Sequence, residues 1–142
     1  MNETKFARIN FKKLVPDAYR AMLALESYVH ETGLEPALLE LVKMRASQIN
    51  GCSYCLDMHS KDARAAGETE QRLYLLNAWR EAPFYNARER AALAWTEAVT
   101  LVSKTNLPDE VYEQAKQQFS ESELVNLTIA IIAMQWLEPA GG

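Results

Sequence analysis

Two cysteines and a histidine form a short motif near the middle of the sequence. The segment from Cys52 to His59 has the pattern CxxCxxxH. On a helix, side chains three and four positions apart share one face, so Cys52, Cys55 and His59 would form one row. A thiol reacts as its thiolate, and a helix N-terminus or a neighbouring proton acceptor lowers its pKa from about 8.5. The spacing favours thiol chemistry, with Cys52 at the helix start and Cys55 one turn before His59.

The same three residues predict a redox cycle. Cys55 could pass its proton to His59 and attack an electrophilic oxygen or sulfur atom. Attack on a peroxide would leave a sulfenic acid on Cys55, and Cys52 could condense with it to close a Cys52–Cys55 disulfide with loss of water. An outside reductant would then have to restore both thiols.

Two other interpretations of the motif stay open. A cysteine taken alone is often an inert buried residue, and only the combined spacing favours chemistry. Two cysteines and a histidine are also zinc ligands, but a closed zinc site needs four protein ligands. The other histidine, His30, is better explained as a solvated residue near a helix C-terminus. We therefore expect no metal and no cofactor.

The elements that position this motif are predicted to be helices. Apolar residues recur at helical spacing between prolines and glycines, and no segment alternates like a half-buried strand. We expect Thr69 to cap one helix, and Ser120 with Glu123 to form a capping box for the last. The expected helices run from Pro16 towards Gly33, Pro36 to Asn50, Cys52 to Ala66, Thr69 to Trp79, Ala87 to Ser103, Asp109 to Phe119 and from Ser120 onward. The fold class is thus all-α with six or seven helices, and CxxC lies at the N-terminus of a central one.

Length and composition narrow the class of protein. The 142 residues suit a single domain over residues 1–142, and 49% apolar content allows a real core. The net charge of −4, without a basic stripe, argues against nucleic-acid binding. The segment Met1 to Lys13 lacks the apolar stretch of a secretory signal, and Leu124 to Leu137 is too short to span a membrane. We expect a cytoplasmic protein that binds neither nucleic acid nor membrane.

An acidic residue extends the motif into a recognisable pattern. Glu40 lies twelve positions before Cys52, and Ala66-Gly67 follows the histidine. Together these residues resemble the alkylhydroperoxidase D-like proteins of the carboxymuconolactone decarboxylase superfamily, over the stretch from Glu40 to about Leu101. The resemblance implies an all-helical fold, assembly into trimers or hexamers, and a peroxidase-like cycle in which the second cysteine attacks and the first resolves. It also implies that Glu40 shares a proton relay with His59; without it, Glu40 would be taken for a solvated glutamate.

One position departs from that family's pattern. Some members carry a histidine where this chain has Tyr54, and a phenol with a pKa of about 10 cannot accept a proton near neutral pH. The relay would then be shorter or slower, and Tyr54 is better explained as packing at the pocket mouth. Some superfamily members lack the cysteines and act as lactone decarboxylases, an activity against which the two thiols argue.

Three functions follow from these observations. We expect an enzyme that reduces small-molecule hydroperoxides through the Cys52–Cys55 disulfide, with an external thiol or dithiol protein as reductant and a homo-oligomeric assembly. The first alternative is a decarboxylase or similar lyase acting on a small cyclic acid. The second is a non-catalytic, redox-sensing oligomer. An apolar stripe could serve its interface but is more typical of a core; it consists of Leu124, Leu127, Ile131 and Met134.

Overall fold

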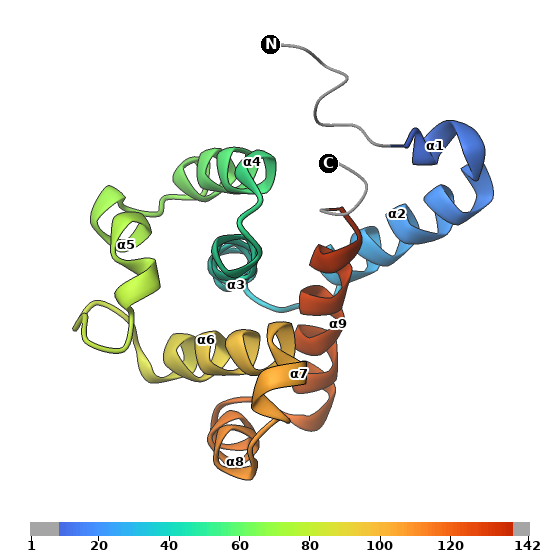
Figure 1. Cartoon of the computed structure of the whole chain (residues 1–142). Coiled ribbons are helices and arrows are strands. Elements are labelled where there is room, and N and C mark those ends of the chain that lie inside the picture. Colours follow the sequence, from blue (N-terminus) through green and yellow to red (C-terminus); the bar gives the residue numbers. More distant parts are fainter. Residues whose placement is uncertain (1–8, 138–142) are drawn as a thin grey trace.

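The structure is a computed structural model that describes residues 9–137, all of whose regular elements are helical (Figure 1). Within that range the elements are α1 (Phe11–Leu14), α2 (Pro16–His30), α3 (Pro36–Asn50), α4 (Ser53–Ala65), α5 (Glu70–Tyr74), the 3-10 helix η2 (Leu76–Ala78), α6 (Ala87–Thr100), α7 (Val102–Thr105), α8 (Asp109–Gln118) and α9 (Glu121–Leu137). The all-α prediction is confirmed. The expectation for Met1 to Lys13 falls mostly on residues 1–8, which lie outside the described residues.

Helix α3 organises the core. It packs against α4, α6 and α9, and Figure 1 shows it almost end-on between them. One face of α3 places Leu39 and Val42 against α6 and α9, and another places Leu41 and Met44 against η2 and α6. Full burial of such side chains stabilises the fold by about 1.5–3 kcal/mol each. A helix held on several sides is a rigid support for any functional residue that it carries.

The predicted helix ends are largely confirmed. Pro16 and Pro36 occupy the first turns of α2 and α3, where the missing N–H of proline costs nothing. Gly51 ends α3 with φ of 70°, a left-handed conformation that glycine adopts readily. The Thr69 hydroxyl accepts from the Arg72 N–H at 3.2 Å, capping α5.

The Ser120–Glu123 capping box is also present. The Glu123 N–H donates to the Ser120 hydroxyl at 3.2 Å, and the Ser120 N–H donates to the Glu123 carboxylate at 2.9 Å. The apolar stripe of α9 that follows, which could have been an interface, is buried in the core. No helix between residues 9 and 137 is long and apolar enough to cross a membrane.

The count of nine α-helices in residues 9–137 exceeds the predicted six or seven because of short elements. The predicted helix from Thr69 to Trp79 changes to 3-10 geometry after Tyr74. In a 3-10 helix, side chains three apart eclipse one another, which brings Leu76 and Trp79 into the same core cluster. The predicted helix from Ala87 to Ser103 stops at Thr100, and α7 adds a single turn ended by Asn106 with φ of 55°. The four-residue α1 is likewise a single turn.

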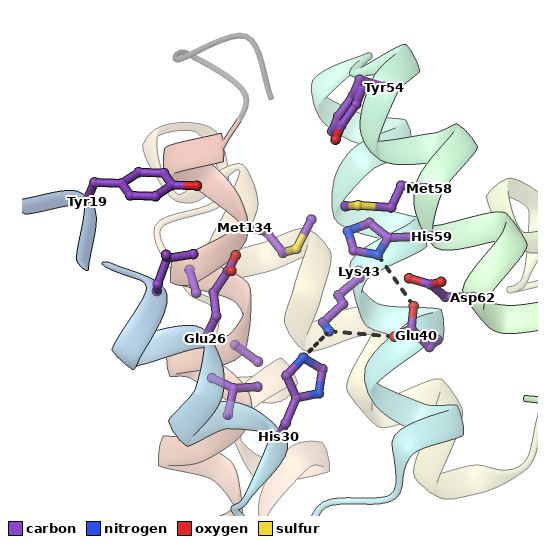
Figure 2. Close-up of a pocket in the computed structure, with 14 residues that line it drawn as sticks. Tyr19, Glu26, His30, Glu40, Lys43, Tyr54, Met58, His59, Asp62 and Met134 are labelled. Atoms are coloured by element: carbon purple, nitrogen blue, oxygen red, sulfur yellow. Dashed lines mark hydrogen bonds and ion pairs between the residues drawn. The ribbon is translucent and has the colours of Figure 1, made fainter. Parts of the chain in front are cut away.

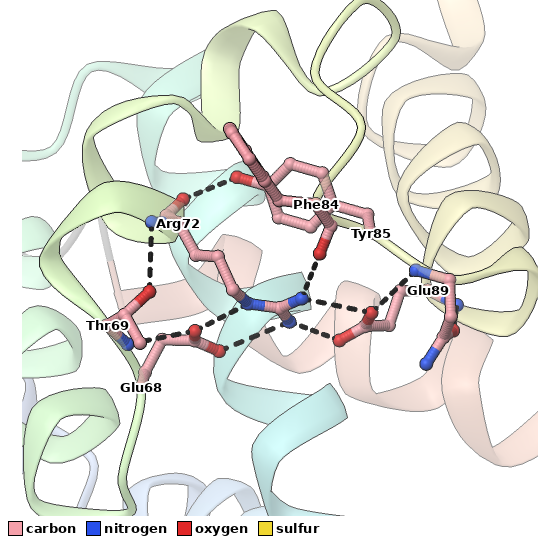
Figure 3. A network of polar contacts seen from close by, with 7 residues as sticks. Glu68, Thr69, Arg72, Phe84, Tyr85 and Glu89 are labelled. Atoms are coloured by element: carbon pink, nitrogen blue, oxygen red, sulfur yellow. Dashed lines mark hydrogen bonds and ion pairs between the residues drawn. The ribbon is translucent and has the colours of Figure 1, made fainter.

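A network around Arg72 secures the chain after α4 (Figure 3). The Arg72 guanidinium donates to Glu68 at 2.6 Å, to Glu89 at the start of α6, and to the Phe84 carbonyl. Its plane lies over the Tyr85 ring, 4.9 Å from the centroid. Hydrogen bonding to Glu89 first, and then to Glu68, raises the Arg72 pKa well above its usual range. The network holds the segment between α4 and α6 against the first turn of α6.

Helix α2 stands apart from the rest of the fold. Of its residues, only Val29 is buried, and among the longer helices α2 packs chiefly against α9 (Figure 1). Aromatic rings of Phe11, Tyr19 and Trp136 meet edge to face or tilted, with centroids 5.7 to 6.0 Å apart, and fasten α1 and α2 to the C-terminal end of α9. Helix α2 is thus held in place mainly by its contacts with α1 and α9.

Candidate functional site

The two cysteines lie at the start of α4. Cys52 is the N-cap residue, and its sulfur accepts the Cys55 N–H at 3.3 Å. The unpaired N–H groups of a first helical turn create a positive end at which anions are stabilised. The prediction that CxxC lies at a helix N-terminus is confirmed.

The cysteines differ in exposure. Cys55 is wholly buried at 0% exposed, whereas Cys52 is half-buried. No disulfide joins them in this structure. Tyr54, between them, is 55% exposed. The sulfur within reach of a partner protein is therefore that of Cys52.

His59 lies one turn after Cys55 and faces Glu40 of α3 (Figure 2). The His59 ring is 5% exposed, and its Nδ1 is 3.4 Å from Glu40 Oε2. That separation is longer than the usual hydrogen bond of about 2.7–3.2 Å. Within the described chain, neither ring nitrogen of His59 nor Glu40 Oε2 has a hydrogen-bond partner. His59 and Glu40 thus form a close, buried pair without a hydrogen bond between them.

Lys43 supports Glu40 from the other side. Its ammonium lies 3.6 Å from Glu40 Oε1 and 3.3 Å from Nε2 of His30, the last residue of α2. Burial by itself raises the Glu40 pKa, but interaction with His59 and with the Lys43 charge outweighs it. The Glu40 pKa is therefore lower than its usual value of 4.5, and this carboxyl group is ionised near neutral pH.

A pocket of about 350 Å³ opens above these residues, between α2, α3, α4 and α9 (Figure 2). Glu26 of α2 faces into it, and burial raises the pKa of this carboxyl, although the charges of Lys43 and His30 oppose the rise. Neither cysteine lines the pocket. Its lining consists of Tyr19, Leu23, Glu26, Val29, His30, Glu40, Lys43, Tyr54, Met58, His59, Asp62, Ala130, Ala133 and Met134.

The structure thus brings together the residues singled out from the sequence, but in two groups. Glu40 and His59 line the pocket, while Cys52 and Cys55 lie beside it on α4. Tyr54 sits at the exposed edge of the pocket. His30 is at a helix C-terminus and exposed, as expected, but it also reaches Lys43.

Sequence reasoning missed Glu26, Lys43 and Asp62. Glu26 and Lys43 line one pocket only because α2 lies beside α3 in the fold, which periodicity cannot reveal. Asp62 could have been singled out from the sequence, since it follows His59 by three positions and so shares its face of α4.

Among the described residues, Glu40, His59 and Asp62 have side-chain types and a proximity that would suit a metal ion.

Comparison with known proteins supports the family resemblance that the sequence suggested. Residues 16–98 match the model of the carboxymuconolactone decarboxylase family. The uncharacterised protein YdfG of Bacillus subtilis is 40% identical over 87% of this chain and 84% of its own length. YnjA of Escherichia coli, also uncharacterised, is 28% identical over 72% of this chain and 55% of its own.

Two solved structures share the fold. One is a protein of unknown function from Agrobacterium tumefaciens, for which an antioxidant-defence role as an AhpD has been suggested. It is 46% identical, with a TM-score of 0.87 over 92% of this chain and 90% of its own. The debrominase Bmp8 superimposes with a TM-score of 0.78 at 24% identity, over 87% of this chain and 67% of its own.

Proposed function

This chain belongs to the carboxymuconolactone decarboxylase family, and from that premise we propose that it is a thiol peroxidase that reduces hydroperoxides through a Cys52–Cys55 disulfide. The observation that carries the proposal is the arrangement of α4: Cys52 caps the helix, Cys55 follows in its first turn, and His59 lies one turn later, 3.4 Å from Glu40. The suggested antioxidant role of the Agrobacterium protein agrees with it.

The proposed cycle consumes two thiols for each peroxide. The Cys55 thiolate attacks the terminal peroxide oxygen, an S–O bond forms, the O–O bond breaks, and the alkoxide leaves as the alcohol after taking a proton. The Cys52 thiolate then attacks the sulfenic sulfur, the S–S bond forms, and the hydroxyl leaves as water. An external dithiol returns two electrons and two protons to the disulfide.

His59 and Glu40 would handle the protons. In this proposal His59 takes the proton of Cys55 and later donates one to the leaving oxygen. Glu40, kept ionised by Lys43 and His59, orients the ring and stabilises its charged form, as a carboxylate does beside a catalytic imidazole. Tyr54 takes no part in this relay.

The two sulfurs differ in exposure, so we propose that they react with different molecules. Cys55 is wholly covered, so peroxide would reach it when the first turn of α4 moves. Cys52 is the sulfur accessible to a protein reductant, and we propose that the external thiol attacks the disulfide there.

Assembly into a homo-oligomer is also proposed. A groove of about 780 Å³ beside α8 and α9 has exposed apolar side chains at its rim, with Val125 58% and Ile132 53% exposed. Exposed apolar surface of this kind is typical of subunit contacts. A trimer or hexamer would cover it.

A lyase activity remains the second candidate because of one observation. The pocket is lined by the acid–base pair Glu40 and His59 but by neither cysteine. Such a pocket could accept a small cyclic acid and transfer protons without a thiol. Its turnover would survive replacement of both cysteines.

Turnover with cumene hydroperoxide and dithiothreitol separates these candidates. We expect Cys55→Ser to abolish peroxide reduction and Cys52→Ser to accumulate a sulfenic acid on Cys55, detectable by a dimedone adduct. Undiminished peroxide reduction by Cys55→Ser would refute the thiol cycle.

A further inference from the structure

Three ligand-type side chains converge on the floor of the pocket. One ligand atom from each of Glu40, His59 and Asp62 lies within 4.8 Å of the others, and Figure 2 shows the three side chains facing one another. His59 and Asp62 are three positions apart on α4, so they share a face, and Glu40 comes from the adjacent α3. Metal sites in helical bundles are built in this way, from a pair spaced i, i+3 and a carboxylate on a facing helix.

A second observation points to a ligand. His59 is 5% exposed, yet among the residues described here its Nε2 has no hydrogen-bond partner, and its Nδ1 faces Glu40 Oε2 at 3.4 Å without forming a hydrogen bond. Buried polar atoms are nearly always paired, because removing such an atom from water without giving it a partner is unfavourable. These atoms border the same cavity. They would be satisfied by an electron-pair acceptor seated between them.

We propose that Glu40, His59 and Asp62 bind a divalent first-row cation of the zinc class. One imidazole nitrogen with two carboxylate oxygens is a donor set that suits Zn²⁺ and its neighbours, whereas Ca²⁺ and Mg²⁺ take oxygen ligands. Three protein ligands leave a coordination position open towards the pocket for water.

The surrounding charges allow such an ion. Lys43 opposes it, but the ammonium lies beside Glu40 Oε1, while Oε2 faces His59. Lys43 also has His30 at 3.3 Å as a second partner. Two carboxylates against one ammonium leave the site negative, and Glu26 adds a further acidic group to the pocket wall.

The cation would act as an inhibitor, a consequence that rests on the proposed thiol cycle. An ion held by His59 and Glu40 occupies the electron pairs with which they would move the proton of Cys55. Peroxide-driven disulfide formation would then slow in the presence of the ion and recover when a chelator removes it.

Binding is tested with Zn²⁺ by isothermal titration calorimetry. The background is Cys52→Ser with Cys55→Ala, which removes the thiols as competing ligands, and circular dichroism checks that it remains helical. Asp62→Asn is compared with Asp57→Asn, a matched control at an exposed position of α4 paired with Lys61. We expect one equivalent of Zn²⁺ in the background and in the control. We also expect Asp62→Asn to weaken it by about tenfold or more, since even an outer-shell partner contributes that much.

If the cysteine-free background does not fold, the same two Asp variants are compared in the native chain with Co²⁺. Thiolate ligation to Co²⁺ gives a separate near-ultraviolet charge-transfer band, so nitrogen and oxygen ligation is read from the visible bands. Absence of saturable binding, or equal binding by Asp62→Asn and Asp57→Asn, would overturn the site.

The inhibitory consequence is measured separately in the native chain, as disulfide formation after a hydroperoxide pulse with and without Zn²⁺. Slower formation that a chelator reverses, and that Asp62→Asn weakens, supports it; an unchanged rate with Zn²⁺ bound refutes it. If no disulfide forms even without Zn²⁺, the thiol cycle fails, while calorimetry still decides the site.

Discussion

Glu40 of α3 and His59 of α4 lie 3.4 Å apart at the floor of the pocket, nineteen positions from each other in the sequence. The core holds α3 on several sides and α4 packs directly against it, so the pair is set by two rigid elements. Proton transfer by a positioned side chain depends on such placement.

Replacing Glu40 with glutamine should slow peroxide-driven disulfide formation. A neutral amide cannot stabilise a charged imidazole, and a positioned acid–base group contributes about 10²–10⁴-fold to a rate, so we expect a loss of about tenfold or more. The measurement is the single-turnover rate of disulfide formation, with Glu110→Gln on the exposed surface of α8 as control. Equal rates in the two variants would show that Glu40 has no part in the relay.

Cys52 should have a structural role as well as a chemical one. Its sulfur accepts the Cys55 N–H at the start of α4. Cys52→Ala removes that acceptor and should lower the free energy of unfolding by about 0.5–1 kcal/mol, whereas Cys52→Ser retains a good N-cap oxygen and should not. Urea denaturation of the reduced proteins tests this; an alanine variant as stable as the serine variant would contradict the capping role.

Arg72 should be among the most sensitive charged positions outside the pocket. Its loss would leave Glu68 and Glu89, both largely buried, without their partner. Breaking a fully buried pair costs about 3–5 kcal/mol, and because Arg72 is 21% exposed we expect Arg72→Met to cost about 2–3 kcal/mol. Arg64→Met, which breaks a solvent-exposed pair with Glu70, serves as control and should leave the stability nearly unchanged, because solvent screens exposed ion pairs. Equal thermal stability of the two variants would contradict the assignment.

Glu97 should make the fold sensitive to acid. Burial raises its pKa, but hydrogen bonds from Trp79 and Arg80, with the charge of Arg45, lower it more, so the folded-state pKa is below 4.5. A carboxyl whose pKa is depressed on folding stabilises the protein above its unfolded pKa, and that stabilisation is lost as pH falls through the folded pKa. The native chain should therefore lose stability below about pH 4.5 more steeply than Glu97→Gln, as measured by denaturation at several pH values. An equally steep loss of stability with falling pH in the two proteins would contradict this role of Glu97.

The helix boundaries were predictable where single residues determine them. Pro16, Pro36 and Gly51 begin or end helices through their own backbone restrictions, and Ser120 with Glu123 caps α9 through local hydrogen bonds. The single-turn helices α1 and α7 were not predictable, because four residues are too few to show a period.

The site was predictable only in part. The spacing of Cys52, Cys55 and His59 on one helix follows from geometry, whereas the approach of Glu40 was expected only through family resemblance. The burial of Cys55 accompanies the packing of α4 against α3, and the contact of Lys43 with His30 depends on how α2 lies beside α3. Neither arrangement can be predicted from a local sequence pattern.

The most direct test of the thiol cycle is the intact mass of the reduced protein before and after one equivalent of hydroperoxide, with thiols counted by alkylation. We predict loss of both thiols of the chain, a mass decrease of two hydrogens, and full recovery with dithiothreitol. Two alkylatable thiols and an unchanged mass after the peroxide would contradict a Cys52–Cys55 redox cycle and favour chemistry by Glu40 and His59 alone.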